Sequence, residues 1–430
     1  MKIILLSGGA GKRLWPLSNS VRAKQFLKLL TSPSGRRESM IQRIVRQIRT
    51  SGLAEEIVVA TGLSQIGLIE RQLGNKQPIV TEPARKDTFP AVYLACLFLY
   101  QNGTPRDEPI LVLPCDTYAS DGYFSALSRM GNAVNDDSAA NMVLLGVKPT
   151  YPSSKYGYII PEKDEKSSTG IRMIKSFVEK PDVSEASILV QEGALWNTGV
   201  CGFKLDYLLK LGCEVFKTMD YSIFMEKYSE LPKLNFSYEV LAKGNNKAVV
   251  EYDGDWNDIG TWNSLTSEMK MQEIGKVISE DCHESMIIND LNIPLVCVGC
   301  DNKIVVASSE GILVADKEQT ENIRHLVDQI VTNPINYSKL CDNSKEVEKF
   351  ITIKGTSLKI RFCTIPTLRS LDYHINEAVD ELWIIIGGTG ELSVESHIFE
   401  LTPMSVVVIP KGSSYGVRTQ SFLNMIIVAL

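Results

Sequence analysis

Apolar and polar positions along the first 150 residues alternate in blocks that predict a repeated strand–helix order. Short continuous apolar runs predict strands over residues 2–6, 57–60, 78–80, 110–113 and 142–147. Between them, apolar residues recur at helical spacing over 40–48, 66–73 and 88–100. Ser39 and Gln42 form a capping-box pattern before the first of these helices. Continuous rather than alternating strands, separated by helices, indicate a doubly wound α/β fold whose parallel sheet is covered on both faces.

The pattern of apolar positions changes twice farther along the chain. Strands of mixed pattern are expected over 158–160, 174–178 and 200–203, still within a first domain that we place at 1–265. A small β-rich segment with a helix follows at 266–335, where short apolar runs are separated by Asp-Asn and Glu-Gly turns. Residues 345–430 contain further short apolar runs at a spacing typical of a small sandwich or barrel.

Composition and charge place the chain among ordinary globular proteins. It has 430 residues, 44% of them apolar, and a formal net charge of −6. That is enough chain to bury sizeable cores, and the acidic average gives no general attraction to nucleic acid or anionic membranes. The apolar run 91–100 is far shorter than the roughly 20 residues of a membrane span. Gly8 comes too early for a secretory signal, so we expect a cytoplasmic protein without membrane or nucleic-acid partners.

The number and spacing of the cysteines are typical of a protein in a reducing compartment. There are nine of them, scattered along the chain, which favours free thiols over a disulfide framework. Cys297 and Cys300 have C-x-x-C spacing, and a zinc or redox site there would need Cys282 or His283 as partners. Alternating apolar residues around the pair favour buried strand thiols instead.

A glycine-rich loop follows the first predicted strand. In a doubly wound sheet, ligands bind beyond the carboxyl ends of the strands, here after Leu6, Val80 and Leu113. Residues 8–13 read GGAGKR, and such glycines let backbone N–H groups approach a polyanion. The loop lacks the earlier glycine and the following Ser or Thr of a phosphate loop, and Leu14 occupies the third glycine position of a dinucleotide fingerprint. A tight turn with solvated charges is the simpler interpretation of this loop taken alone.

Charged residues after the other strands change that interpretation. Lys24 follows the glycine loop, Glu82 to Asp87 (EPARKD) follow the strand at 78–80, and Asp116 follows the strand at 110–113. Each of these positions lies at a predicted carboxyl end. Cations, carboxylates and a glycine loop that meet at one edge of a sheet suit a nucleoside triphosphate with a divalent metal.

Eight segments occur in an order that matches a known family. GGAGKRLWP, AKQF, EPARKDTFPA, LPCD, YGYI, FVEKP, WNTG and WNDIG resemble the motif series of sugar-phosphate nucleotidyltransferases, most of all the mannose-1-phosphate guanylyltransferases. The resemblance covers residues 1 to about 330, and the C-terminal part resembles the cupin-like domain often fused to these enzymes. It implies a Rossmann-like, glycosyltransferase-A-like catalytic domain, a small β segment and a cupin-like β-sandwich.

The resemblance also implies a reaction. This chain would transfer a guanylyl group from GTP to mannose 1-phosphate, giving GDP-mannose and pyrophosphate. The sugar phosphate oxygen attacks the α-phosphorus directly, so no enzyme nucleophile is required. Preorganised donors and bound Mg²⁺ stabilise the charge on the transferring phosphate.

The same resemblance assigns residues to roles. Arg13, Lys24 and Asp116 are expected to take part in catalysis, and Asp116 with Asp258 to hold Mg²⁺, which commonly takes one or two carboxylates plus phosphates. Glu82 resembles a base-contacting position that could accept from guanine N1–H and the N2 amine. The nucleotide side comprises Leu6, Gly8, Gly9, Gly11, Lys12, Arg13 and Glu82, and the sugar-phosphate side comprises Gly157, Glu179, Lys180 and Asn197.

Each assigned residue also has an ordinary structural interpretation. Asp116 and Asp258 are residue types common in turns, and Glu82, Glu179 and Lys180 could be solvated surface charges.

Several positions depart from the family pattern. Lys12 stands where the family usually has Thr, Ala23 where it has Pro, and Thr117 where it has His. Residues 86–87 are Lys-Asp instead of Arg-Asn, and an anion at Asp87 would repel phosphates if it faced them. These departures bear on the sugar and the base, whereas the cations and both metal carboxylates are retained.

The C-terminal domain carries an incomplete cupin metal motif. His374, Glu381 and Gly388 have the motif's spacing, but Asn376 and Tyr415 replace two of its histidines. Because borderline metals prefer imidazole, we expect a structural or dimer-forming domain without isomerase activity. A homodimer would use this domain or the β-rich 290–315 segment.

Rival functions remain open at this point. The same chemistry could act on another nucleotide or another sugar 1-phosphate, such as a heptose. A non-catalytic nucleotide-sugar sensor would not need the retained Arg13, Lys24, Asp116 and Asp258. A bifunctional isomerase–transferase is disfavoured by Asn376 and Tyr415, and a dinucleotide oxidoreductase by Leu14.

Overall fold

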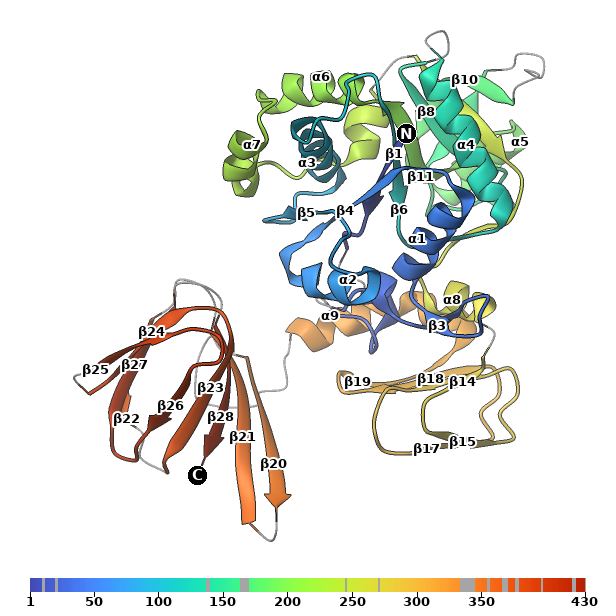
Figure 1. Cartoon of the computed structure of the whole chain (residues 1–430). Helices are drawn as coiled ribbons and strands as arrows, with labels where there is room; N and C mark the ends of the chain where they lie inside the picture. Colours follow the sequence, from blue (N-terminus) through green and yellow to red (C-terminus); the bar gives the residue numbers. More distant parts are fainter. Residues whose placement is uncertain are drawn as a thin grey trace. The chain divides into compact units, whose positions relative to one another are not determined.

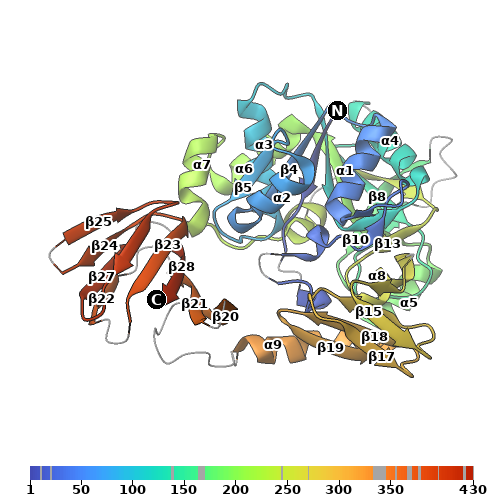
Figure 2. The ribbon, with the colours of Figure 1, turned by 60° about the horizontal axis from the view of Figure 1, so that its bottom comes forward.

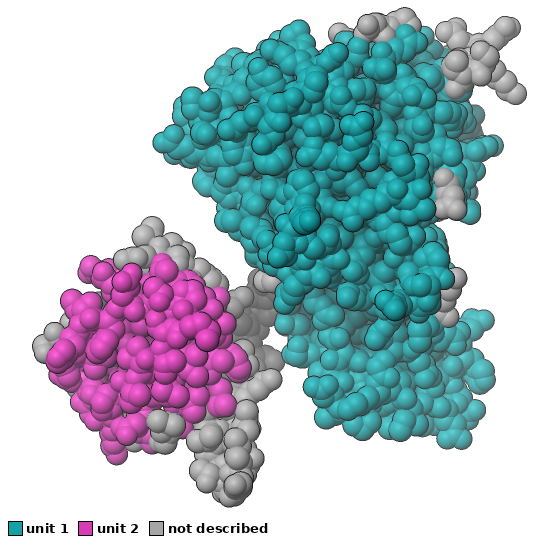
Figure 3. All heavy atoms as spheres, viewed as in Figure 1, with its two compact units in different colours: residues 1–328 teal, residues 329–430 magenta. Residues whose placement is uncertain are grey.

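The computed structural model divides the chain into two compact units, residues 1–328 and 329–430 (Figure 3). The described residues are 1–9, 12–19, 22–136, 140–162, 170–243, 246–269, 271–332, 345–353, 356–365, 370–375, 379–395, 397–419 and 423–429. Gly11 and Asn376, and the side chains of Lys12 and His374, lie outside the described part of the chain. Within that part, no helix has both the length and the apolar character that a membrane crossing requires.

A large mixed sheet forms the centre of the first unit (Figure 1). Its strand order is β5-β4-β1-β6-β11-β8-β12-β10-β9. All strands predicted between residues 2 and 203 are present, with somewhat different ends. Their bounds are β1 Lys2–Leu6, β4 Glu56–Gly62, β5 Ile79–Glu82, β6 Pro109–Pro114, β8 Met142–Val147, β9 Tyr158–Pro161, β10 Ile171–Val178, β11 Leu195–Lys204 and β12 Lys247–Tyr252.

The strands predicted over the first 150 residues run parallel to one another as expected, and a strand from the later, mixed region is inserted antiparallel among them. β5, β4, β1 and β6 are parallel neighbours as expected. β11, however, lies between β6 and β8 and runs antiparallel to both. Like the parallel strands it is buried on both faces, so its apolar residues do not encode its direction. Strand direction follows from the chain connections and the hydrogen-bond register, which an apolar pattern does not contain.

Helices cover both faces of this sheet (Figures 1 and 2). Alternate residues of β1 enter opposite cores, Ile3 and Leu5 on one face and Ile4 on the other, which explains the continuous apolar run. Ser39 caps the first helix in the predicted capping box with Gln42. The first face holds α1 Met40–Ser51, α2 Ile66–Leu73 and α4 Asp121–Asn135, and the second holds α3 Thr88–Gln101, α6 Leu205–Phe216 and α7 Tyr221–Lys227. α5 Val183–Gln191 packs beside β9.

The small β-rich segment shares a core with the residues that follow the glycine loop. Leu14 and Leu17 pack in one cluster with Ile288 and Ile304. The Ser308 hydroxyl also donates to the Pro16 carbonyl at 2.7 Å. The segment therefore supports the stretch that carries Arg13 and Lys24. Its elements are α8 Trp262–Glu268, β14 Glu273–Ile274, β15 Val277–Glu280, β16 Met286–Asn289, β17 Leu295–Val298, β18 Lys303–Ser308, β19 Gly311–Asp316 and α9 Arg324–Thr332.

The expectation of buried strand thiols for the C-x-x-C pair is confirmed for Cys297, whereas Cys300 lies after the end of β17. Cys297 is in β17 and is buried against Ile287 and Val305, and Cys300 is partly buried beside it.

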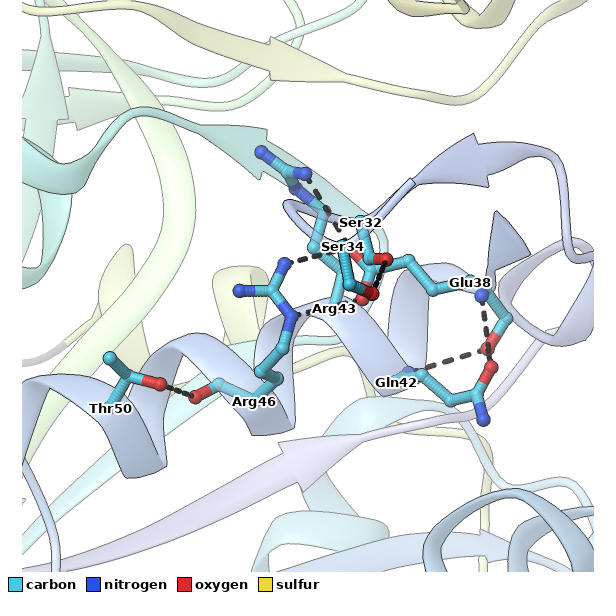
Figure 4. A network of polar contacts seen from close by, with 8 residues as sticks. Ser32, Ser34, Glu38, Gln42, Arg43, Arg46 and Thr50 are labelled. Atoms are coloured by element: carbon cyan, nitrogen blue, oxygen red, sulfur yellow. Dashed lines mark hydrogen bonds and ion pairs between the residues drawn. The ribbon is translucent and has the colours of Figure 1, made fainter. Parts of the chain in front are cut away.

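A polar cluster joins α1 to Glu38, at the end of the short strand that precedes the helix (Figure 4). Arg46 donates to both carboxylate oxygens of Glu38, at 3.0 and 2.7 Å. Arg43 lies 3.6 Å from the same carboxylate, and its guanidinium is 4.3 Å from the centre of the Tyr118 ring. Tyr118 belongs to β7 Thr117–Ala119, while Glu38 ends the hairpin of β2 Leu30–Thr31 and β3 Arg37–Glu38.

The second unit is a β-sandwich, as predicted. Its two sheets have the orders β20-β21-β28-β23-β26 and β22-β27-β24-β25, and both contribute to one apolar core. The first sheet consists of β20 Lys345–Ile353, β21 Thr356–Ile365, β23 Glu381–Gly387, β26 Val406–Ile409 and β28 Leu423–Ala429. The second consists of β22 Ser370–Ile375, β24 Gly390–Val394, β25 His397–Leu401 and β27 Ser414–Thr419.

One residue of the expected cupin motif is engaged inside this sandwich. The Glu381 carboxylate accepts hydrogen bonds from Arg361 and from the Trp383 indole, the latter at 2.9 Å. An arginine partner neutralises the charge that a metal would otherwise use. The expectation of a structural domain stays a prediction.

Candidate active site

The carboxyl ends of β1 and β5 border a cavity of about 570 Å³. Leu6, Gly8, Gly9 and Glu82 line it, so the structure brings together four residues predicted for the nucleotide side. The other lining residues come from the end of β4 and the segment 82–91. The cavity therefore lies where a doubly wound sheet binds its ligands.

The glycine loop needs its glycines for two different reasons. Gly9 has a φ of +126°, a backbone conformation that side chains with a Cβ rarely adopt. Gly8 faces Glu82 across the cavity, and a Cβ at Gly8 would lie 4.0 Å from the Glu82 Oε1 atom. The loop thus keeps its backbone exposed to the cavity.

A buried polar network holds the base of the glycine loop. The Gln25 side chain is buried and donates to the Ser7 carbonyl at 2.9 Å and to the Ser7 hydroxyl at 3.2 Å. Thr61 donates to the Gln65 side chain at 2.8 Å, and the Ser7 backbone donates to the Ala60 carbonyl. Buried polar groups are costly unless they are paired, so this network fixes where the loop leaves β1.

A second cavity, of about 230 Å³, holds the residues predicted for the sugar phosphate and the metal. The two cavities are neighbours, because Leu6, which lines the first, pairs in the sheet with Pro114, which lines the second. The predicted residues along its wall are Asp116, Gly157, Glu179, Lys180, Asn197 and Asp258.

The two predicted metal carboxylates lie together because two short strands pair. Asp258 ends β13 (Trp256–Asp258), which runs antiparallel to β7 and pairs Asp258 with Thr117. Asp116 directly precedes Thr117. The two carboxylates are far apart in the sequence, and this two-stranded pairing makes them neighbours.

Lys24 lies between these carboxylates. Its ammonium nitrogen is 2.6 Å from Asp116 Oδ2 and 3.6 Å from Asp258 Oδ1, and it donates to the Ile259 carbonyl at 3.1 Å. Burial by itself lowers the pKa of Lys24, but the two carboxylates outweigh burial and raise it above its ordinary value. Burial also raises the pKa of Asp258, against the opposing charge of Lys24.

Arg13 approaches the same turn from the glycine-loop side. It is exposed and belongs to a 3₁₀ turn, Lys12–Leu14. A Cβ at Gly260 would lie 3.3 Å from an Arg13 guanidinium nitrogen, and the Arg13 charge acts on Asp258. Two cations from the segment after β1 thus face the two carboxylates.

Close packing explains Gly157. Tyr158, the next residue, pairs with Val178 at the end of β10, so Gly157 lies beside Glu179. A Cβ at Gly157 would lie 2.6 Å from Glu179 Oε2 and 2.8 Å from the tip of the Phe177 ring. Glycine is the residue that lets the Glu179 carboxylate reach the cavity wall.

Lys180 follows Glu179 in an unusual backbone conformation. Its φ is +49° although it has a side chain and precedes Pro181, and such backbone strain concentrates at functional sites. The Lys180 ammonium pairs with the Glu179 carboxylate, and both residues line the second cavity. The second cavity therefore contains this cation and carboxylate in addition to Asp116 and Asp258.

Asn197 reaches the cavity through an irregularity in β11. The register of β11 against β8 shifts between Asn197 and Cys201. Asn197 donates its backbone N–H to the Gly157 carbonyl at 2.8 Å, and its side-chain oxygen accepts from Gly199 at 3.2 Å. These bonds fix its side chain next to Gly157.

Asp87 lines the first cavity, and its carboxylate is engaged in two hydrogen bonds. It caps α3, accepting from the Thr88 backbone at 2.7 Å, and also accepts from the Asn235 side chain at 3.2 Å. Its carboxylate is thereby engaged at a helix N-terminus, where negative charge is favourable.

Sequence reasoning missed three residues of this region. Gln25 lies inside the quoted AKQF segment, but only its burial shows that it supports the loop. Trp256 lines the second cavity together with Asp258. Tyr228 bonds to Glu82 from far along the chain, and no local pattern marks it.

The profile of the nucleotidyl transferase family matches residues 2–273, more than half of the chain. The chain belongs to this family. Among curated relatives, a putative mannose-1-phosphate guanylyltransferase of Vibrio cholerae is 28% identical, over 96% of this chain and 93% of that protein. A mannose-1-phosphate guanylyltransferase of Escherichia coli is 26% identical, over 96% of this chain and 95% of that protein.

A solved structure also resembles this chain. It is described as mannose-1-phosphate geranyltransferase from Thermus thermophilus, with a TM-score of 0.63 and 26% identity. The similarity covers 77% of this chain and 98% of that chain. The Rossmann-like α/β fold expected for the first unit is confirmed by the family match and this structure.

The packing at Gly157 gives a first prediction. Gly157→Ala should displace Glu179 and weaken binding of a sugar 1-phosphate by about tenfold or more, because small misplacements in a site are costly. Binding of a nucleoside triphosphate should stay unchanged. Isothermal titration with each ligand measures both effects.

Gly67→Ala is the matched control for this prediction. Gly67 lies inside α2 with nothing within 4 Å of an added Cβ, so the change should leave both affinities unaltered. Equal affinities of Gly157→Ala and the native chain for the sugar phosphate would contradict the assignment of the second cavity.

Proposed function

We propose that this protein transfers a guanylyl group from GTP to mannose 1-phosphate, giving GDP-mannose and pyrophosphate. The observation that carries the proposal is the pair of neighbouring cavities, in which predicted nucleotide residues line one and predicted sugar-phosphate residues line the other. Asp116 and Asp258 line the second of these cavities, and the charges of Lys24 and Arg13 act on them. The names of the Vibrio cholerae and Escherichia coli relatives support the choice of substrates.

The residues divide the work between binding and charge stabilisation. In this proposal the glycine loop donates backbone N–H groups to the triphosphate, and Arg13 with Lys24 neutralises it. Lys180 holds the sugar phosphate, while Glu179 and Asn197 contact sugar hydroxyls, which need acceptors and donors. The sugar phosphate oxygen then attacks the α-phosphorus in line, and pyrophosphate leaves on the opposite side.

The carboxylate pair fits a divalent metal. Asp116 and Asp258 share one cation, Lys24, so one carboxylate oxygen of each lies near the same ammonium group. Hard cations such as Mg²⁺ take one or two protein carboxylates and complete their shell with phosphate oxygens and water. Bound there, Mg²⁺ would stabilise the negative charge that develops on the transferring phosphate.

The carboxylate of Glu82 favours guanine as the base of the nucleotide. It lines the nucleotide cavity, and a carboxylate can accept both the N1–H and the N2 amine of guanine. Adenine and cytosine offer one amine donor beside a ring acceptor, and uracil and thymine offer one N3–H between two carbonyl oxygens, so guanine alone offers two adjacent donors to a carboxylate.

A pyrophosphate-release screen tests the whole proposal. It combines four nucleoside triphosphates with a panel of sugar 1-phosphates that includes mannose and heptose. Fastest turnover with GTP and mannose 1-phosphate is expected. Faster turnover with another pair would redefine the substrates, and no turnover with any pair would favour a nucleotide-sugar sensor.

Asp116→Asn should reduce the rate of pyrophosphate release by at least about a hundredfold, because it removes one of the two carboxylates proposed to hold the metal. The fold should persist, since the amide keeps the size of the side chain. The control is Asp253→Asn. Asp253 is an exposed acid that precedes β13, so this variant should release pyrophosphate at the native rate. Native turnover by Asp116→Asn would contradict the metal assignment.

Lys24→Met gives a prediction that does not depend on turnover. Without the ammonium group, no cation offsets the two carboxylates. The affinity of the protein for Mn²⁺, measured in the absence of nucleotide, should therefore rise by about tenfold. Turnover should fall, because the triphosphate loses a cation. Titration followed by electron paramagnetic resonance measures the Mn²⁺ affinity, with exposed Lys28→Met as the control. Equal Mn²⁺ affinities of Lys24→Met and the native chain would contradict this account.

We propose further that the C-terminal sandwich has no isomerase activity. Arg361 and Trp383 engage Glu381, and Tyr415 stands in place of a histidine ligand. Neither mannose 6-phosphate nor fructose 6-phosphate should be converted when Zn²⁺ or Co²⁺ is added. Interconversion of the two sugars in a coupled assay would show an active metal site instead.

A further inference from the structure

Tyr228 reaches Glu82 from a distant part of the chain. It begins the 3₁₀ turn Tyr228–Glu230 that follows α7, and it lies 146 residues from Glu82. The Tyr228 hydroxyl donates to Glu82 Oε2 at 2.7 Å. The Tyr228 ring is fully buried and packs edge-on against Phe224, with ring centres 5.6 Å apart. The donor therefore comes from a rigid core side chain.

The segment after Tyr228 is bonded to the loop that carries Glu82. The Leu234 backbone donates to the Lys86 carbonyl at 3.0 Å and accepts from the Phe89 N–H at 3.0 Å. The Phe236 N–H donates to the Thr88 hydroxyl at 2.8 Å. The segment and the loop therefore form one unit, and the geometry at Glu82 depends on both.

One carboxylate oxygen of Glu82 is left facing the cavity. Tyr228 engages Oε2, whereas Oε1 is the oxygen that approaches Gly8 across the nucleotide cavity. When a rigid donor holds one oxygen of a carboxylate, the other oxygen also keeps a fixed orientation. Fixing the carboxylate before the base binds lowers the entropy cost of binding.

We propose that Tyr228 is the positioning residue for base recognition: its hydroxyl orients Glu82 so that the carboxylate reads the N–H donors of a guanine base. This inference rests on the proposed function, since it takes Glu82 to contact the base. Tyr228 itself touches no substrate and acts through Glu82.

The charges around Glu82 define a second role for the same hydrogen bond. Burial raises the pKa of Glu82, and the Tyr228 hydrogen bond and the Arg85 charge lower it, whereas Asp87 raises it further. Burial and the neighbouring Glu82 raise the pKa of Tyr228, so its hydroxyl stays protonated and keeps donating. Loss of this donor should therefore move the protonation of Glu82 to higher pH.

Tyr228→Phe tests the inference, because it removes the hydroxyl and keeps the buried ring. The dissociation constant and KM for GTP should rise about tenfold, with kcat and the KM for mannose 1-phosphate nearly unchanged. The acidic limb of the pH profile of kcat/KM for GTP should shift to higher pH. ITP, which lacks the N2 amine, should lose less affinity than GTP.

A double-variant cycle separates positioning from a general structural effect. If Tyr228 acts through Glu82, Tyr228→Phe should change GTP affinity little when Glu82→Gln is already present. Tyr221→Phe, in the neighbouring α7, is the matched control and should leave both KM values and the pH profile unchanged. Additive losses in the double variant, or equal losses for GTP and mannose 1-phosphate, would overturn the inference.

Failure of the proposed function gives a different result from failure of this inference. Native protein that binds GTP without turnover would contradict the enzyme proposal, while titration of Tyr228→Phe with GTP would still test the role of Tyr228. Native turnover together with unchanged GTP affinity in Tyr228→Phe would overturn the role of Tyr228 alone. Unfolding curves of Tyr228→Phe and Tyr221→Phe check that both variants are folded.

Discussion

The ion cluster of Lys24, Asp116 and Asp258 is the interaction on which the site depends. It joins three parts of the chain: the segment after the glycine loop, the end of β6 and the end of β13. The negative charge of Asp116 raises the pKa of Asp258, so a cation between the two carboxylates stabilises the arrangement that the pairing of β7 with β13 creates. In the free protein Lys24 supplies that charge, and the same position is where we expect a divalent metal to act.

Support for this cluster comes from both sides. The small β-rich segment packs its apolar residues against Leu14 and Leu17, which fixes the stretch that carries Arg13 and Lys24. On the other side, Arg43 connects Glu38 to Tyr118 in β7, next to Asp116. These contacts explain why a segment without predicted site residues is packed so closely against the catalytic part of the chain.

Preorganisation extends to both ligand sides. The buried Gln25 side chain donates hydrogen bonds to the Ser7 carbonyl and hydroxyl, and so fixes the start of the glycine loop. Gly157 leaves just enough room for Glu179, and the irregularity in β11 aims Asn197 at the same cavity. A reaction between two anions gains most from charges and donors that need no rearrangement when the substrates meet.

Much of this site could be predicted from residue order. Local patterns gave the strands and helices of the first unit, and the loops after Leu6, Val80 and Leu113 carry Gly8, Glu82 and Asp116, which line one or the other cavity. Strand direction was not predictable at β11, since a strand buried on both faces has the same composition in either direction. The bond between Tyr228 and Glu82 was not predictable either, because a buried tyrosine carries no local mark of its partner.

The sequence by itself determined which chemical groups are present and which end of the sheet they occupy. Apolar periodicity and capping depend on neighbours within a few residues, and the order of eight short segments carried the family resemblance. Only the tertiary structure decided which groups meet: Lys24 with two carboxylates, Glu179 with Gly157, and Tyr228 with Glu82. The physical reason is that these contacts arise from strand pairing and core packing between distant segments, whose energies no local pattern contains.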